Sequence, residues 1–427
     1  MERYREYKDS GVQWIGEIPI HWNCVQFRGI FSITKRIAGR TGLDVLAVTQ
    51  KGIKVKDVES NEGQIAADYS KYQIVEPGDF AMNHMDLLTG FIGISPQYGV
   101  TSPDYRVFKK NSSLADSKYY LYIFELCYKQ QIFYGLGHGV SNKGRWRLPA
   151  PIQNRFEIPL PPLAEQEKIV RYLEGKTSKI DAYVAEKEKE IQLLQELKQK
   201  TIADAVTKGL NPEVKMKDYS SLIASSYPNH WRILRNKSFL SLTGEKVGDR
   251  ASEFVLLSLT TKGVIVRDLE SGKGKFPKDF DTYQFVRKGE LVFCLFDIDE
   301  TPRTVGLVDT EGMLTGAYTA FKVNSEIALP EYVYNYFLCV DNIKALKPYY
   351  SGLRKTVRAD KFLQIYIPLP SLDEQKAIVA YIEEKCQKID TLVSELQAEI
   401  DNMKEYKQRL IADCVTGQVN VQKENKQ

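Results

Sequence analysis

Cysteine and histidine are scarce in this sequence, and neither forms a cluster. The six cysteines lie far apart in the 427 residues without a CxxC pair, and the four histidines are scattered. Metal-binding modules and disulfide frameworks both need regular, close spacing of such residues, so neither is expected. We therefore predict reduced thiols in a cytoplasmic protein, with no metal site.

Long hydrophobic runs are also missing. No apolar run approaches the roughly 20 residues that cross a bilayer, and residues 1–10 are studded with charges where a signal peptide needs an apolar core. No membrane partner is expected. The hydrophobic content of 43% is nevertheless ample for buried cores, and the length predicts about three domains at roughly 150 residues each.

An excess of one charge is absent too. The 59 Lys and Arg residues are nearly balanced by 55 Asp and Glu, which leaves a formal net charge of +4. Any affinity for nucleic acid must therefore come from local basic surfaces.

Motifs for nucleotides and cofactors do not occur in the sequence. There is no GxxxxGK[ST] loop and no strand followed by an Asn-Pro-Pro-aromatic element, and the glycine-rich residues 135–139 follow a predicted helix, which indicates a flexible loop. We predict no catalytic residues and no cofactor bound by this chain. One alternative is a metal-dependent nuclease, because Asp104 after Pro103, with Asp116 and Lys118, fits a loose PD...(D/E)xK pattern. A turn and a helix start explain Asp104 and Asp116 well enough, and the second copy reproduces neither the carboxylate after the proline nor the lysine.

An internal repeat organises the chain. Residues 158–166 (IPLPPLAEQ) return as residues 367–375 (IPLPSLDEQ), a shift of 209. Between residues 158–207 and 367–416, 27 of 50 positions are identical, where unrelated sequences give about 3 from average composition. The preceding segments repeat more faintly, with a shift that drifts from 209 to 211 and 213. The chain is a duplication, with one preserved and one diverged half in each copy.

The preserved blocks predict two long helices. Apolar residues step by alternating fours and threes, which is typical of the a and d seam of a coiled coil. Ser371 and Glu374 suggest a capping box at one helix start, while Gly209 and Pro212 form a stop signal for the other helix. Each helix should run for about 45 residues, and two such seams most simply pack on each other as an antiparallel coiled coil. The predicted seam residues are Leu173, Ile180, Val184, Ile191, Leu194, Ile382, Ile389, Val393, Leu396, Ile400 and Met403.

The diverged segments predict mixed domains. Short β-rich runs at residues 45–48, 91–94, 254–258 and 291–295 lie between turn signals, and helices are expected near residues 118–128 and 331–338. The predicted class is α+β: two mixed α/β domains joined by two long helices in a pseudo-two-fold, intramolecular coiled coil. The predicted boundaries are residues 1–157 for domain 1, 158–212 for helical spacer 1, 213–366 for domain 2 and 367–427 for helical spacer 2.

Cationic residues recur at matching places in both copies. Residues 141–147 (SNKGRWR) and 351–358 (SGLRKTVR) lie at the same place before the two long helices. Such residues suit phosphate contacts beside a groove, with Asn, Thr and Arg available for base edges. A solvated strand edge explains each single lysine, but the duplication favours the set. The candidate DNA-binding residues are Lys51, Lys54, Lys56, Asn83, His84, Lys143, Arg145, Arg147, Thr261, Lys262, Arg267, Arg303, Arg354, Lys355 and Arg358.

Residues 7–19 (YKDSGVQWIGEIP) with His21 and Trp22, and the twice-occurring PLPxLxEQ element before a long helix, resemble the specificity subunits of Type I restriction-modification systems. The resemblance spans the entire chain. It implies two target recognition domains, each reading one half of a split site in double-stranded DNA, on helices that dock two modification (methyltransferase) subunits and set the half-site spacing.

The resemblance also implies a division of labour. S-adenosylmethionine, ATP and Mg²⁺ would belong to the modification subunits and to the restriction (translocase and nuclease) subunits. Divergence between the two domains fits two different half-sites, because identical domains would read an inverted repeat. A specificity subunit of a fused restriction-methylation enzyme outside Type I is a further alternative.

Overall fold

A computed structural model describes residues 2–50, 52–58, 68–139, 146–267, 280 and 282–422 of the chain. The chain divides into two compact units, Met1–Lys187 with Ala398–Gln427, and Glu188–Gln397. Each unit therefore combines one diverged segment with parts of both long helices. We call the mixed α/β part of the first unit, residues 2–160, head 1, and that of the second unit, residues 213–369, head 2.

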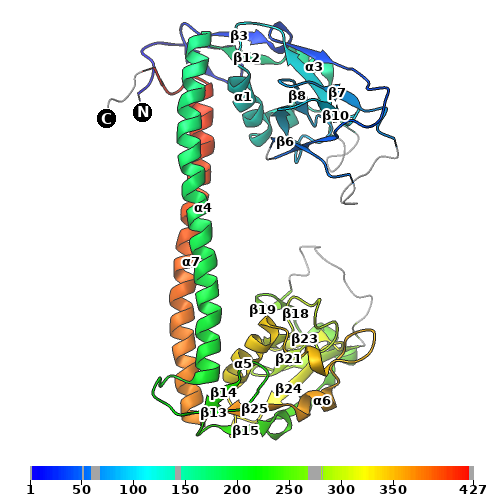
Figure 1. Ribbon diagram of the computed structural model, residues 1–427, viewed down its shortest axis with the longest axis vertical. Coiled ribbons are helices and arrows are strands. Elements are labelled where there is room, and N and C mark those ends of the chain that lie inside the picture. The colour runs from blue at the N-terminus through cyan, green and yellow to red at the C-terminus, as the bar shows by residue number, and fades with distance from the viewer. Residues whose placement is uncertain are drawn as a thin grey trace. The chain divides into compact units, whose positions relative to one another are not determined.

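The described part of head 1 is built from short strands, three α-helices and one 3₁₀ helix (Figure 1). Its central sheet is antiparallel with the order β4-β11-β8-β9. Its elements are β1 (Tyr7–Asp9), β2 (Glu17–Pro19), β3 (Asn23–Gln26), η1 (Phe27–Gly29), β4 (Phe31–Thr34), β5 (Leu46–Thr49), β6 (Gly52–Val55), β7 (Gln73–Val75), β8 (Phe80–Met82), β9 (Ile92–Ile94), β10 (Gly99–Thr101), β11 (Arg106–Lys110), α1 (Ser117–Lys129), α2 (Ile132–Gly135), α3 (Ala150–Arg155) and β12 (Glu157–Leu160).

The core of head 1 uses both faces of this sheet. Phe80 and Phe108 from neighbouring strands stack with ring centroids 4.9 Å apart, and Phe124 of α1 lies 5.8 and 5.7 Å from them. Successive residues of a strand point to opposite faces. Ala81 accordingly belongs to a separate cluster that includes Leu46 of the β5–β6 hairpin. The sheet is thereby fixed between a helix and a hairpin.

Head 2 repeats this plan. Its central sheet has the order β16-β24-β21-β22, and the helix that corresponds to α1 is α5, also of 13 residues. Its elements are β13 (Met216–Asp218), β14 (Ser226–Pro228), β15 (Arg232–Arg235), η2 (Asn236–Ser238), β16 (Leu240–Thr243), β17 (Glu245–Lys246), η3 (Gly248–Glu253), β18 (Leu257–Thr260), β19 (Gly263–Val266), β20 (Tyr283–Val286), β21 (Leu291–Phe293), β22 (Val305–Leu307), β23 (Gly312–Thr315), β24 (Thr319–Val323), α5 (Pro330–Asn342), η4 (Lys347–Tyr349), α6 (Ala359–Gln364) and β25 (Tyr366–Leu369).

Both predicted head helices are confirmed, and the predicted strands are found with small shifts. The largest shift affects residues 254–258, because the strand begins only at Leu257. Phe254 instead caps the short helix η3, and its ring lies 4.6 Å from that of Phe285. Packing against this ring takes Phe254 out of the strand.

The two long helices are α4 (Leu163–Lys208, 46 residues) and α7 (Leu372–Val415, 44 residues). Within each unit their segments run antiparallel and side by side (Figure 1). In the first unit Lys407 Nζ lies 2.6 and 2.7 Å from the carboxylate oxygens of Asp181. In the second unit Lys198 Nζ lies 2.7 Å from both oxygens of Asp390.

The seam residues follow the predicted periodicity. Six are buried: Leu173, Ile180, Val184, Ile382, Ile389 and Ile400. Five are half-buried: Ile191, Leu194, Val393, Leu396 and Met403. The predicted α+β class with an antiparallel pair of long helices is confirmed.

A buried glutamine joins each head to the start of its long helix. Gln166 accepts a hydrogen bond from the Asp116 amide at 2.8 Å and donates to the carbonyls of Leu114 and Pro161 at 2.9 and 2.8 Å. In the second copy, Gln375 makes the same three bonds. The repeated glutamine therefore satisfies backbone groups that would otherwise be buried without partners.

The neighbouring glutamate completes this joint. Glu165 lies 2.9 Å from His21 Nε2, and Glu374 lies 2.9 Å from His230 Nε2. The predicted capping box forms only in part. Ser371 Oγ accepts from the Glu374 amide at 3.3 Å, but the Glu374 carboxylate accepts from Trp231 Nε1 at 2.9 Å. Tertiary partners thus replace the reciprocal capping bond.

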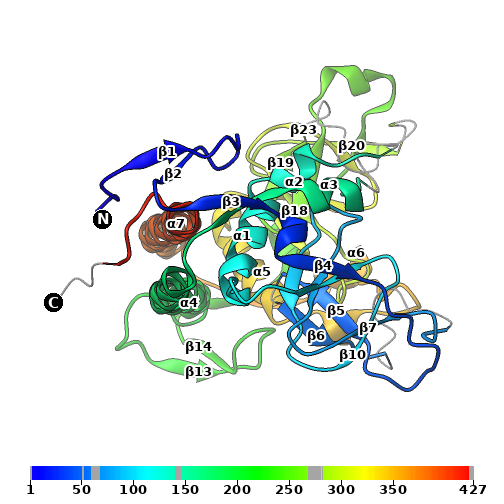
Figure 2. The same cartoon turned by 90° about the horizontal axis from the view of Figure 1, so that it is seen from above.

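The C-terminal end of each long helix lies beside a hairpin of the unit in which that helix ends. Figure 2 shows β1–β2 beside α7 and β13–β14 beside α4. Gly209 and Gly417 follow the helix ends with φ of +71° and +77°. A side chain at Gly417 would also meet Pro19 at 2.4 Å. Glycine is therefore required there both by backbone conformation and by space.

Candidate nucleic-acid interface

A cleft of about 910 Å³ opens in head 1 beside the β5–β6 hairpin. The loops after β8 and β10, Tyr72 and the segment before α3 form its other walls. Three of the candidate DNA-binding residues line it, namely Lys56, Asn83 and Arg147. The remaining lining residues are Val45, Leu46, Ala47, Tyr72, Met85, Asp86, Leu88, Thr89, Thr101, Ser102, Asp104, Tyr105 and Trp146.

The chemistry of this cleft suits a polar, flat ligand. Two cations can contact phosphates, while amide, hydroxyl and carboxylate groups can pair with base edges. Three aromatic side chains, Tyr72, Tyr105 and Trp146, add apolar surface. Burial and the nearby Asp86 raise the pKa of Tyr105, so its hydroxyl stays protonated.

The loop after β8 is held rigidly before any ligand arrives. Tyr128 of α1 donates its hydroxyl to the Asn83 carbonyl at 2.7 Å. The Asp86 carboxylate accepts from the amides of Leu88 and Thr89 at 3.0 and 2.9 Å. Burial acts to raise the pKa of Asp86, but a hydrogen bond from the Thr89 hydroxyl, together with the amide bonds, outweighs it and lowers the pKa. A preorganised loop loses little entropy on binding.

His84 stands beside the cleft in a partly buried position. Burial, followed by the positive charges of Arg106 and Arg147, lowers its pKa to about 4. Its Nδ1 is buried without a hydrogen-bond partner. His84 is therefore neutral at physiological pH and cannot serve as a cation there.

Gly137, within the glycine-rich residues 135–139, lies against Trp146 of the cleft. A side chain at Gly137 would lie 2.5 Å from the indole of Trp146, whose Nε1 donates to the Tyr134 carbonyl at 2.7 Å. His138 and Arg147 exchange two backbone hydrogen bonds. Close approach to Trp146 therefore explains Gly137.

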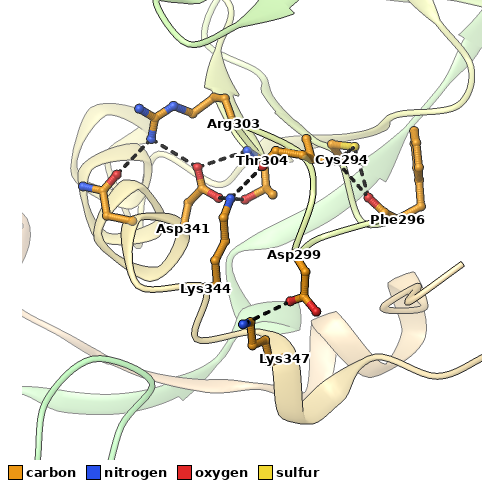
Figure 3. Close-up of polar contacts among 10 residues, drawn as sticks. Cys294, Phe296, Asp299, Arg303, Thr304, Asp341, Lys344 and Lys347 are labelled. Carbon is orange, nitrogen blue, oxygen red and sulfur yellow. Dashed lines mark hydrogen bonds and ion pairs between the residues drawn. The ribbon is translucent and has the colours of Figure 1, made fainter. Parts of the chain in front are cut away.

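Head 2 holds the corresponding loop, residues 294–304, in a different way (Figure 3). The carboxylate of Asp341, which is 2% exposed, accepts from the Thr304 hydroxyl at 2.7 Å and from its amide at 3.1 Å. Lys344 and Arg303 form ion pairs with the same carboxylate at 2.7 and 3.1 Å. Part of the Arg303 guanidinium is thus committed to holding the loop.

Asp341 and Tyr128 occupy equivalent positions on α5 and α1. The equivalence follows from Tyr119 and Tyr332, whose hydroxyls donate to Val415 and Val206 near the ends of the long helices. The same helix position therefore holds the loop that follows β8 in head 1 and the loop that follows β21 in head 2. The side chain at this position is a tyrosine in head 1 and an aspartate in head 2.

A short hairpin, residues 351–356, adjoins this loop in head 2. The Asp297 amide donates to the Arg354 carbonyl at 2.9 Å, and Lys355 Nζ lies 3.4 Å from Asp299 and 3.3 Å from Glu300. The guanidinium of Arg354 lies over the Phe296 ring, 5.9 Å from its centroid. Arg354 and Lys355 are thereby brought together with the loop.

The other candidates are more dispersed. Lys54 is exposed on β6, while Thr261 and Lys262 are exposed at the turn between β18 and β19. The Arg267 amide donates to Leu256 as the Lys56 amide donates to Val45, which confirms the repeat alignment. Arg358 is exposed and pairs with Asp360 at 3.0 Å. Lys51, Lys143 and Arg145 lie outside the described residues.

Several residues of the candidate interface and its supports carried no signal in the sequence. Tyr72, Tyr105 and Trp146 are aromatic residues without a motif, and Asp341 lies 37 residues from the Thr304 that it holds. The only available signal was the position of Trp146 within the cationic residues 141–147.

Two kinds of feature are absent from the described ranges. No helix there is long and apolar enough to cross a membrane. Within the same ranges no group of three His, Cys, Asp or Glu residues could hold a metal ion.

Known proteins resemble the chain in sequence and fold. It is 22% identical to the putative type I restriction enzyme MjaX specificity subunit of Methanocaldococcus jannaschii, over 95% of this chain and 96% of that protein. It is 24% identical to the type I restriction enzyme MjaVIII specificity subunit of the same organism, over 83% and 84%. A chain from a solved type I R-M system structure has a TM-score of 0.68 at 15% identity, covering 94% of this chain and 99% of that one.

The family described as Type I restriction modification DNA specificity domain matches residues 26–195 and 297–402. These two ranges include most of α4 and α7, the cleft loops of head 1, and most of the loop and the whole hairpin of head 2. The chain belongs to this family of Type I restriction-modification DNA specificity proteins.

Proposed function

We propose that this chain is the non-catalytic specificity subunit of a Type I restriction-modification complex. Head 1 and head 2 each read one half of a bipartite double-stranded DNA target. The helices α4 and α7 dock two modification subunits and set the distance between the half-sites. Methylation with S-adenosylmethionine, and ATP- and Mg²⁺-dependent cleavage, take place in the partner subunits.

One observation carries this proposal: the two heads share the same arrangement of strands and helices but differ in their exposed loops. The joints at Gln166 and Gln375 are the same, bond for bond. The loops fastened by Tyr128 and Asp341 differ in length, sequence and chemistry. A duplicated frame with different loops is what two different half-sites require, since groove contacts depend on the side chains that the loops present.

The nuclease alternative has less support. Asp116 accepts from the Tyr119 amide at 2.9 Å as the N-cap of α1, and Lys118 pairs with Glu174 of α4 at 2.6 Å. Two of the three residues of the PD...(D/E)xK pattern thus have structural partners. Metal-dependent cleavage by the purified chain alone would favour the alternative.

Long-read sequencing that detects methylated bases tests the proposal. The chain is expressed with its modification subunits in a host that lacks other methyltransferases. We expect one methylated motif of two short specified parts separated by unspecified bases. Methylation of a continuous motif, or methylation that persists without this chain, would overturn the proposal.

A further inference from the structure

Leu353 lies at the tip of the 351–356 hairpin in head 2 and is fully exposed, with an exposed fraction of 103%. The other exposed large hydrophobic side chains of the described residues reach 64% at most. Burying a leucine side chain is favourable because its apolar surface leaves water. This apolar surface is therefore available for a contact.

The hairpin presents Leu353 in a fixed way. Ser351 and Thr356 exchange two backbone hydrogen bonds of 3.0 and 3.1 Å across its base. Gly352 and Lys355 both adopt left-handed conformations, with φ of +76° and +43°. Since a left-handed lysine is uncommon, the surrounding bonds must hold the turn.

Further backbone hydrogen bonds join the hairpin to the loop at residues 294–304. The Val357 amide donates to the Leu295 carbonyl at 2.8 Å, just beyond the Asp297–Arg354 bond. The cations Lys355 and Lys347 outweigh the effect of burial and lower the pKa of Asp299, so its carboxylate stays charged and keeps the anchor. Asp341 then fastens the same loop to α5 through Thr304, and Figure 3 shows the contacts of Asp341 and the ion pair of Asp299 with Lys347. Leu353 therefore projects from a rigid platform.

The charges beside Leu353 favour an anionic partner. Arg354 is exposed and forms no ion pair with any described residue. The nearby carboxylates of Asp299 and Glu300 are already paired with Lys355. An apolar tip beside an unpaired guanidinium matches DNA, where phosphates attract the cation and bases offer apolar surfaces.

We infer that Leu353 makes an apolar contact with a base of the half-site that head 2 reads. This inference rests on the proposed function and adds a specificity-determining residue to it. The contact can be made with a thymine methyl group or between two stacked bases, and both are known for apolar side chains at protein–DNA interfaces.

The test measures binding of the complex with modification subunits to its target DNA. Leu353→Ala should weaken binding about five- to tenfold, as expected when only part of a leucine side chain is buried in the contact. Leu353→Met should retain most of the affinity. Leu242→Ala, which changes a leucine 55% exposed on β16 of the same head, should have no effect. With the second half-site scrambled, Leu353→Ala and the wild type should bind equally.

Two substituted DNAs distinguish the forms of contact. If replacing thymine by uracil weakens binding of the wild type as much as Leu353→Ala does, and does not weaken binding of the Leu353→Ala variant further, then Leu353 contacts the thymine methyl group. If 2-aminopurine fluorescence rises on binding of the wild type but not of Leu353→Ala, the side chain separates two bases. Equal binding of the target by the wild type and Leu353→Ala would overturn the inference alone. Failure of the wild type to prefer its target would overturn the proposed function.

Discussion

Lys198 of α4 lies 2.7 Å from both carboxylate oxygens of Asp390 on α7, and the repeat exchanges this pair with Lys407 and Asp181. Asp181 lies 17 residues before Lys198 on α4, and its partner Lys407 lies 17 residues after Asp390 on α7. Each such surface pair adds only about 0.2–1 kcal/mol. Together they define one antiparallel register for the two helices.

This register allows the spacer to be lengthened without losing its pairing. A helical heptad is inserted in α4 after Leu194 and another in α7 near Ser394, which the register places opposite. Seven residues keep the seam in phase and add about 10 Å. We expect the unread gap in the methylated motif to grow by about three base pairs, at 3.4 Å each, while both half-sites stay the same. An assembled, active variant with the original gap would show that the partner subunits set the spacing.

Head exchange tests the independence of the two readings. The strands β3 and β12 pair with each other and should be retained in the exchange. Residues 27–155, which lie between them, are replaced by those of another specificity chain. One half of the methylated motif should change and the other half should persist. Sequencing of methylated DNA gives the answer, and a change in both halves would contradict the prediction.

Gln166 should contribute strongly to the stability of the first unit. Gln166→Ala removes three hydrogen bonds at a residue that is fully buried and leaves backbone groups without partners. We expect a loss of about 2–4 kcal/mol in the free energy of unfolding, measured by urea denaturation. Gln192→Ala, at an exposed position of α4, is the matched control and should change it by less than about 0.5 kcal/mol. Similar losses for both would mean that the joint is dispensable.

His84 should make stability depend on pH. Its pKa is about 4 in the folded chain and about 6.5 when unfolded. Between these pH values the unfolded chain binds more protons than the folded chain. The contribution of neutral His84 to the free energy of unfolding is therefore present above pH 6.5 and is lost as the pH falls toward 4. His84→Gln should flatten the pH dependence of the unfolding free energy between pH 7 and 5, while His138→Gln, at an exposed position of the same head, should leave it unchanged. Identical curves for the wild type and His84→Gln would contradict this expectation.

The exposed arginines beside the cleft and the hairpin should contact phosphates. Arg147→Ala, Arg354→Ala and Arg358→Ala should each weaken binding on all DNA sequences. Each change should also reduce the slope of log K against log salt by about 0.9. Titrations at several salt concentrations measure this slope. Arg409→Ala on α7 is the control, and an arginine whose removal leaves the slope unchanged does not contact a phosphate. The same experiment with Arg145→Ala tests a candidate outside the described residues.

The sequence by itself determined the repeat, the two long helices and their antiparallel seam. These depend on short-range periodicity: Leu173 and Ile180, or Ile382 and Ile389, are spaced so that one helix face is apolar whatever the rest of the chain does. Gly209 ended its helix for an equally local reason, the need for a left-handed residue. The family resemblance followed from the same preserved blocks.

Only the tertiary structure decided which head residues come together. Lys56, Asn83 and Arg147 share a cleft because the β5–β6 hairpin packs on the central sheet and the Leu148 amide donates to the His84 carbonyl, which brings together segments distant in sequence. The partner of Arg303 is Asp341, 38 residues away, and nothing in the spacing of the two indicates the pair. Leu353 looked like any apolar residue until its hairpin proved to be anchored with the side chain outward. Exposure and partnership depend on long-range packing, and local sequence patterns do not contain them.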